Sequence, residues 1–362
     1  MNSILKWIEE VAIASKTPNN GPLVDTHIEA FRELRRGYRD MTPNQFAETM
    51  TSASFANYFA DALSRQFYSD YNYKTGAWQA YVYQDTAPDF RDVDRFRMTE
   101  PNTLYRRGEK GEAEADYITD SVISYGVYEF ARQMDFSWRT IKNDDLGEIR
   151  RTPQRMANAA RRWLDAYVSA LYDNATTQAT LAALLAPWAG TGRLTAPNLA
   201  IGLNAMRQRT DVLGNQLQFS QLHLVIPPIL EIQAASILRD LLGYGGAGGN
   251  VLSTFINPTN VHVDPYIAFA GANVPWYLFA DPSEAPAVTL VRLQGMTGPA
   301  VYKKSSNIQM MIGNVPPEMA MGSFEDGDIE FMVEDIVGAW DDASYVGVTD
   351  FRAIYYSSGT TA

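Results

Sequence analysis

The pattern of polar and apolar positions is most distinctive between residues 88 and 174, where a polar segment runs directly into an amphipathic one. Residues 88–120 alternate charged side chains and carry little apolar surface, so we expect them to lie against another surface instead of forming a core of their own. The stretch RRGEKGE at 106–112 places two glycines among charges, which is typical of a hairpin turn at the tip of this segment.

A long helix is predicted after this segment, from Pro153 to about Asn174. Thr152 and Pro153 suit an N-cap and a first helical position, and the apolar residues that follow recur on one stripe. At the usual rise per residue this helix is on the order of 30 Å long, which is enough to cross a domain.

The N-terminal part is predicted to be a helical arm, because it lacks an obvious core of its own. Three of its segments space their apolar residues for one helical face, namely 2–16, 25–38 and the stretch from Thr42 toward Tyr58 or Tyr68. Aromatic and polar residues then alternate from Tyr71 to Tyr83, which predicts a strand, and a looser alternation at 117–138 predicts a returning strand.

The second half of the chain has the composition of a separate domain with mixed helices and strands. Helices are predicted at 196–210 and 231–243, and the second of them ends at the glycine-rich stretch 243–250. Strands are predicted at 222–230, 261–267, 274–281, 287–293, 328–340 and 350–359.

Composition narrows the function classes. The chain has 362 residues, of which 46% are hydrophobic and 20% charged, so it is long enough to bury a sizeable core. Its net charge of −12 argues against general nucleic-acid binding, which needs a surplus of Lys and Arg, but is compatible with a protein that sits near nucleic acid without adhering to it. The 20 Tyr and 7 Trp suit either a large aromatic core or subunit interfaces.

Several kinds of chemistry are excluded or disfavoured. The chain has no cysteine, which rules out disulfides, thiolate nucleophiles and cysteine-ligated metals. It has no run of 18 apolar residues that would span a membrane, and Glu9 and Glu10 interrupt the apolar stretch that a signal peptide would need. We therefore expect a protein that is made and used in a cytoplasm.

No group of residues in the sequence indicates an active site. His27, His223 and His262 lie far apart in sequence, and structural roles are expected for them unless the fold brings them together. Asp144 and Asp145 stand just before the long helix, where they suit its dipole better than acid–base catalysis. The glycine-rich stretch lacks the spacing and the lysine of a phosphate-binding loop. We expect no enzyme activity, no cofactor and no metal.

The tip of the polar segment carries the residues that we expect to contact other subunits. These are Arg106, Arg107, Glu109, Lys110 and Glu112. Such a cluster is either a solvated hairpin tip or a complementary contact on a neighbouring copy. In the second case exposed ion pairs add only about 0–1 kcal/mol each, so they would set register and specificity more than affinity.

In this order of segments the chain resembles the major capsid proteins of tailed bacteriophages, which have the Hong Kong 97-type fold. The resemblance covers about residues 40–360 and is strongest in three places, which are DFRDVDRF through RRGEKGEAEADY, the stretch from FSWRTIKNDDLGEIRRTPQRM to the end of the long helix, and the C-terminal stretch from GDIEFMVEDIVGAW to FRAIYYSSG. It implies an α+β fold with an N-terminal helical arm, an extended hairpin loop, a long spine helix, and peripheral and axial domains.

The resemblance also implies boundaries and partners. They are an arm at 1–87, an extended loop at 88–120, a peripheral domain at 121–184 that is completed by return strands at 326–362, and an axial domain at 185–325. The implied function is a head protein that assembles as hexamers and pentamers into an icosahedral shell around the genome, within the virion and in the host cytoplasm. Portal, scaffolding or decoration proteins are the implied partners, without a membrane and without sequence-specific DNA binding.

The chain departs from the family pattern at two points. Only about forty residues precede the part of the chain that resembles the family, which is short for a built-in scaffold, so we expect scaffolding to be separate or already removed. The founding member of the fold joins a loop lysine to an asparagine near its C-terminus; here Lys110 lies in the matching loop, but no asparagine follows Asn314, so we expect shells without that bond.

Three alternatives stay open from the sequence. An encapsulin, which is a bacterial compartment of the same fold, would enclose an enzyme in place of a genome. A carboxylate-dependent hydrolase would need converging acids in a pocket. A soluble binding module would stay monomeric at high concentration.

Overall fold

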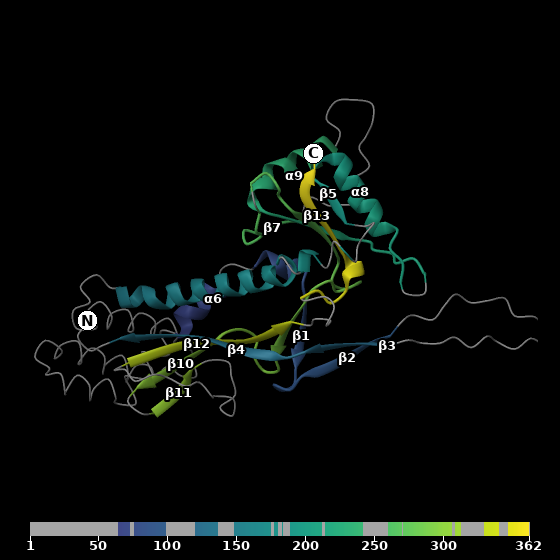
Figure 1. The fold of residues 1–362 in the computed structure, drawn as a ribbon. Coiled ribbons are helices and arrows are strands. Elements are labelled where there is room, and N and C mark those ends of the chain that lie inside the picture. Colours follow the sequence, from purple (N-terminus) through teal and green to yellow (C-terminus); the bar gives the residue numbers. More distant parts are fainter. Residues whose placement is uncertain are drawn as a thin grey trace, which may run out of the picture. The chain divides into compact units, whose positions relative to one another are not determined.

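The computed structural model (Figure 1) describes most of the chain after residue 63. The described residues are 64–72, 76–98, 120–136, 148–174, 177–179, 183, 189–211, 214–241, 260–269, 271–305, 308–312, 329–339 and 347–361. The helices expected before residue 64 therefore lie outside the described part, as do the tip of the polar segment and the glycine-rich stretch.

The chain folds as two compact units, each built from three separate stretches. Unit 1 comprises Met1–Thr75, Glu129–Trp163 and Gln294–Ile336. Unit 2 comprises Gly76–Tyr128, Leu164–Leu293 and Val337–Ala362.

Unit 1 is organised around antiparallel strands. β10 (Ala300–Ser305) pairs with β11 (Ile308–Ile312) on one side and with β12 (Ile329–Ala339) on the other, and β4 (Val127–Phe136) also pairs with β12. In register, Val301 lies between Ile312 and Val333. Tyr302 and Met332 are buried in this part of the core.

The helical parts of unit 1 supply aromatic packing. They are the segment 64–72 and the first part of α6 (Glu148–Tyr172). Phe67 stacks on Tyr71 with ring centroids 5.9 Å apart, and Phe130 of β4 packs against Trp163 of α6 at 4.5 Å. Aromatic pairs at such distances add about 0.5–1.5 kcal/mol to the burial of their surface.

Unit 2 contains a five-stranded sheet whose two central apolar strands are wholly buried. The strand order is β5 (Gly190–Gly192), β13 (Ile354–Thr361), β8 (Trp276–Ala280), β6 (Leu222–Ile226) and β7 (Val261–Val263). Every residue of β6 and β8 is buried, which is why LHLVI and WYLFA read as continuous apolar runs without alternation.

The described part of unit 2 contains α8 (Ala196–Arg207) and α9 (Glu231–Leu241) in addition to the last turns of α6. A side chain on Gly202 of α8 would come within 3.0–3.1 Å of Trp276, Leu278 and Tyr355, so the backbone of this helix packs closely against β8 and β13. The glycine makes this close packing possible.

Two smaller strand groups complete unit 2. β1 (Tyr83–Ala87) runs parallel to β9 (Thr289–Leu293), and the last residues of β12 pair antiparallel with β9. Among the described strands, β2 (Val93–Met98) and β3 (Asp120–Tyr125) pair with each other alone and form an antiparallel ribbon (Figure 1). The short 3₁₀ turns are η2 (Ala77–Ala80), η3 (Pro228–Leu230) and η7 (Phe351–Ala353).

The α+β class predicted from the sequence is confirmed, and so are most elements of the second half. α8 begins at Ala196, as predicted, and the structure shows Thr195 as its N-cap, but the helix ends at Arg207 instead of Thr210. β6 ends before the Pro227–Pro228 pair, because a proline has no backbone N–H to give to a ladder, and a 3₁₀ turn follows.

Two predictions are wrong in detail. The long helix begins at Glu148 and not at Pro153, so the proline sits inside it. As the sixth residue it lies just beyond the first turn, where it removes one hydrogen bond, to the carbonyl of residue 149, from a helix of 25 residues. The strand predicted at 71–83 is wrong as well: a 3₁₀ turn at 77–80 buries Trp78, and its indole Nε1 donates to Asp165 over 2.9 Å.

Candidate interaction surface at the base of the ribbon

The β2–β3 ribbon lacks a third strand in the described part of the chain. Its register runs from Val93 opposite Tyr125 to Met98 opposite Asp120. Across the ribbon, the Ser124 hydroxyl donates to Asp94 over 2.5 Å, and both side chains are exposed. A two-stranded sheet is at best marginally stable in water, so this ribbon needs another surface for support.

The base of the ribbon is fixed by two buried residues on either side of Gly126. Tyr125 and Val127 are buried, with 3% and 5% of their surface exposed. A Cβ on Gly338, near the end of β12, would lie 2.2 Å from the carbonyl oxygen of Gly126. The two backbones therefore pass in direct contact, which only a glycine at 338 permits.

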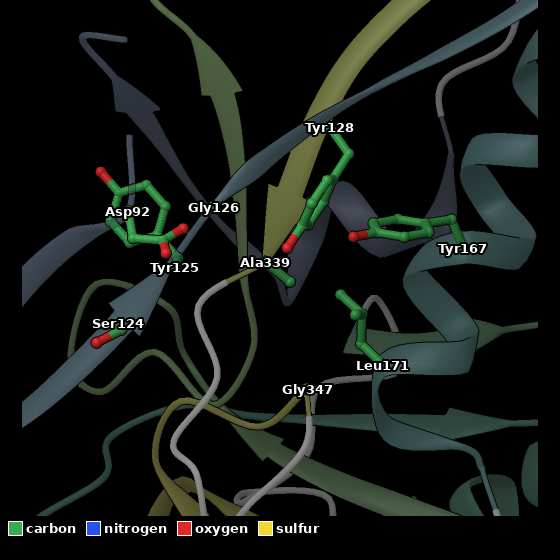
Figure 2. Close-up of a pocket in the computed structure, with 9 residues that line it drawn as sticks. All are labelled: Asp92, Ser124, Tyr125, Gly126, Tyr128, Tyr167, Leu171, Ala339 and Gly347. Atoms are coloured by element: carbon green, nitrogen blue, oxygen red, sulfur yellow. The ribbon is translucent and has the colours of Figure 1, made fainter. Parts of the chain in front are cut away.

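A pocket of about 290 Å³ opens at this base (Figure 2). Its walls come from the end of β3, the start of β4, the last turns of α6 and the end of β12. The side chains that shape it are Asp92, Ser124, Tyr125, Tyr128, Tyr167 and Leu171. In Figure 2 the rings of Tyr128 and Tyr167 enter the space from different walls, with their hydroxyls pointing inward.

The pocket has an acidic and aromatic lining. Among the described residues that line it, Asp92 carries the one charge, and its side chain is exposed. The place that a Cβ on Gly126 would take lies 2.8 Å from Asp92 Oδ1 and 3.6 Å from the Tyr128 hydroxyl, so the carboxylate and the phenol converge over this glycine. Tyr128 leaves 64% of its surface exposed. Such a site suits a cation that can donate hydrogen bonds and pack on aromatic faces.

The wall supplied by α6 is held by a buried hydrogen-bond network. The hydroxyls of Tyr172 and Ser169 both donate to Asp264, and the hydroxyls of Tyr81 and Tyr172 lie 3.1 Å apart. Burial is the main cause that raises the pKa of both tyrosines, so both stay protonated at neutral pH. A fixed helix positions Tyr167 and Leu171 at the pocket.

A second network continues from the end of α6. Asp173 accepts from the hydroxyl of Tyr277 over 2.5 Å, from the amide of Gln178 over 2.6 Å and from the backbone N–H of Ala268 over 2.5 Å. Burial raises the pKa of the Asp173 carboxyl, and the hydrogen bonds oppose this rise. The carboxylates of both networks are thus engaged in holding the fold.

The fold brings two of the three histidines together, which their sequence positions did not indicate. His223 on β6 and His262 on the neighbouring β7 have ring nitrogens 3.0 Å apart, and the other ring nitrogen of His223 lies 3.5 Å from Asp281. Burial and the neighbouring His223 lower the pKa of His262 to about 4, so His262 is neutral at pH 7. Among the residues that the structure describes, no group of His, Asp and Glu could hold a metal ion.

Unit 1 carries a larger groove of about 970 Å³ along β4 and the first half of α6. Phe130, Met134, Met156 and Trp163 give it apolar walls, while Glu129 and Arg132 stand exposed on β4. Grooves of this size and composition are common binding places on protein surfaces. None of the described helices is both long enough and apolar enough to be a membrane span.

The contact residues predicted from the sequence lie outside the described residues. These are Arg106, Arg107, Glu109, Lys110 and Glu112. The same holds for His27, Asp144, Asp145 and the stretch 243–250. Sequence reasoning missed the pocket, although Tyr125-Gly126-Val127-Tyr128 carried a signal, namely a glycine between aromatic residues where a strand ends.

Comparison with known proteins gives one family. A family model described as "Phage capsid protein" matches residues 121–357. A search of curated proteins finds no match.

Solved structures with a similar fold come from several phages. A chain from Mycobacterium phage Adephagia is 13% identical, with 78% of this chain and 89% of that chain covered and a TM-score of 0.45. A chain from Mycobacterium phage Cain is 14% identical, covering 89% and 99%, also at 0.45. A chain from "The capsid of Myoviridae Phage XM1" is 13% identical, covering 78% and 90%, at 0.45. These three TM-scores are below 0.5, so the assignment rests on the family model.

Proposed function

The chain belongs to the phage capsid protein family, and we propose that its β2–β3 ribbon is the arm by which one copy holds the next. As a major capsid protein it self-assembles into the icosahedral shell of the virion. The match of the family model over residues 121–357 is the observation that carries this function.

The ribbon supports the proposed role because no third strand pairs with it among the residues that the structure describes. It is a two-stranded sheet, and Val122 leaves 49% of its surface exposed. Beyond Met98 the chain continues into the charged tip with Arg106, Arg107 and Lys110. A surface on a neighbouring copy would supply the burial that two strands alone lack.

The finer organisation of the subunit follows the same proposal. The arm at 1–87, the extended loop at 88–120, the peripheral domain at 121–184 with 326–362, and the axial domain at 185–325 remain the boundaries that we propose. The sheet that contains β6 and β8, together with α8 and α9, supports a separate axial domain because most of it falls within 185–325.

The proposed partners are copies of the chain arranged as hexamers and pentamers, with portal and scaffolding or decoration proteins beside them. Assembly would take place in the cytoplasm of the host. The net charge of −12 supports a shell that encloses DNA without sequence-specific binding, because a negative inner face does not adhere to phosphates.

A purely structural role, without catalysis, is part of the proposal. It is supported by the way in which Asp264 and Asp173 are used, since both are buried and accept hydrogen bonds that join α6 to other elements of unit 2. Catalytic carboxylates, in contrast, face a cleft that a substrate can enter.

Electron microscopy of the purified protein tests the function directly. We expect uniform closed particles from the full chain, and monomers at high concentration would contradict the proposal. A variant in which a short Gly-Ser turn replaces 99–119 should fold but fail to form shells, because the arm is lost. Circular dichroism and thermal melting check that its subunit is folded, and normal shells from this variant would exclude the ribbon as the arm.

A further inference from the structure

We propose that the pocket over Gly126 is a receptor for an arginine side chain from the ribbon tip of a neighbouring copy, Arg106 or Arg107. This inference rests on the proposed function, because it names the place on the neighbour to which the arm binds. It assigns a ligand chemistry, the guanidinium group, to the pocket at the base of the ribbon.

The chemistry of the lining selects a guanidinium. The Asp92 carboxylate is the charged group of the pocket, and the Tyr128 hydroxyl converges with it over Gly126. A planar cation with several N–H donors can bind the carboxylate and pack its face on a tyrosine ring at the same time. Lysine provides a point charge without such a face, so Lys110 is the weaker candidate of the three tip cations.

The size of the pocket agrees with a single side chain. Its volume of about 290 Å³ lies at the lower end of the range for small-molecule sites, which is roughly 300–1,000 Å³. The mouth is open to solvent at Tyr128 and Ser124, both of which are exposed, so a side chain carried by another protein can enter.

The direction of the strands favours a neighbouring copy over the chain's own tip. Asp92 stands directly before β2, and the strand leads away from the pocket to Met98. At about 3.3 Å per residue this end lies roughly 20 Å from Asp92, and the tip residues follow further along the chain. Because the strand leads away from the pocket, we assign the binding arginine to a neighbouring copy and not to the same chain.

A charge exchange tests the proposal. Asp92→Arg should lower the yield of shells at least tenfold, because it brings two cations together at the pocket. Adding Arg106→Asp and Arg107→Asp to Asp92→Arg should recover most of that loss. Asp89→Arg is the matched control, since Asp89 is an exposed acid of the same segment that does not line the pocket, and its yield should stay within twofold of the parent. A normal yield from Asp92→Arg would overturn the proposal, and so would a loss that the exchanged tip does not relieve.

Cysteine pairs give a second measurement that does not depend on the charge variants being folded. Because the chain has no cysteine, a copy with Ser124→Cys and a tagged copy with Glu109→Cys can be joined only through the introduced thiols. After co-assembly and mild oxidation we expect a tagged–untagged dimer on a non-reducing gel. The control pairs Glu109→Cys with Ala235→Cys, an exposed position on α9, and should give no such dimer.

The pocket as receptor and the shell-forming role of the chain can fail independently. Shells that form without the Ser124–Glu109 dimer would remove the pocket as the receptor and leave the capsid role intact. Failure of the unmodified chain to form any particle would remove the arm proposal itself, and this inference with it.

Discussion

At the scale of single residues, glycines set where the backbone of unit 2 turns and where it touches itself. Gly347 has a φ of 81°, and a Cβ there would lie 2.1 Å from the carbonyl oxygen of Leu171. Gly214 has nearly the same φ, 85°, but nothing lies within 4 Å of the place of its Cβ. A side chain at 214 would therefore meet only the unfavourable left-handed backbone, whereas a side chain at 347 would also collide with the backbone of Leu171.

Gly214 and Gly347 give a prediction for the free energy of unfolding in which one variant is the control for the other. Gly214→Ala should lower the free energy of unfolding by about 1–2 kcal/mol, since only the left-handed conformation is disfavoured. Gly347→Ala should cost more, roughly 3 kcal/mol or above, because the backbone of α6 must also move. Urea unfolding of the unassembled subunits measures both changes. Equal losses in the two variants would contradict the close contact at Leu171.

The histidine pair gives a prediction for pH dependence. The folded pKa of His262 is about 4, below its ordinary value of 6.5, so the unfolded chain binds this proton more readily than the folded one. The resulting stability is present above pH 6.5 and is lost as the pH falls from about 6.5 toward 4. His262→Gln, which keeps a polar partner for His223, should flatten the dependence in this window.

The measurement for this pair is the midpoint of thermal unfolding at several pH values between 7 and 4. The parent protein should lose stability more steeply than the variant across that range. If both lose stability in parallel, His262 is not the group responsible. Comparison above pH 7 serves as the control, because His262 is neutral there in the folded and the unfolded chain.

At the scale of elements, the helices and strands that could be predicted from the sequence are those whose signal lies in adjacent residues. The buried runs of β6 and β8 were found because burial leaves direct marks on neighbouring residues. The turn at 77–80 was missed because its cause is distant: Trp78 is held by Asp165, which is far away in sequence. The pocket was missed for the same reason, since its lining comes from five separate stretches, around residues 92, 124–128, 167–171, 339 and 347.

The ribbon leads to a prediction about protection from solvent. Amides of β2 and β3 should exchange quickly with heavy water in the unassembled subunit, because two unsupported strands open easily. In assembled shells the same amides should exchange at least tenfold more slowly, since the ribbon then lies on a neighbour. Exchange measured by mass spectrometry on both states tests this.

β6 and β8 are the internal control for that experiment. They are buried in the subunit itself, so their amides should be protected in both states. Equal exchange of the ribbon in subunits and shells would mean that assembly leaves it uncovered.

At the scale of the whole molecule, stability is divided between the subunit and the shell. Each subunit buries its own strands and the α6 networks, whereas the ribbon base leaves Val122 and Tyr128 exposed. Interfaces of permanent assemblies bury roughly 2,000–5,000 Å² and resemble a core cut in half, so such residues belong to the assembled state. Apolar surface that a subunit exposes before assembly is then covered in the shell.

The shell itself should be held by non-covalent contacts. If the resemblance described above holds for residues 88–120, Lys110 corresponds to the cross-linking lysine of the founding member of the fold, but residues 315–362 contain no asparagine to join it. We therefore expect intact shells that are boiled in detergent to release single chains on a denaturing gel. A ladder of covalent multimers would contradict this.

The pairing of β2 with β3 determines how the length of the ribbon can change without disturbing the subunit. Its two strands are paired residue by residue from the base outward, so adding or removing matched residues at the tip changes its reach but not its register at Tyr125. The entropic penalty of a longer loop grows only with the logarithm of its length, at about 0.6 kcal/mol for each doubling. If the ribbon is the arm that holds the next copy, such changes would alter the spacing between copies while each subunit goes on folding as before.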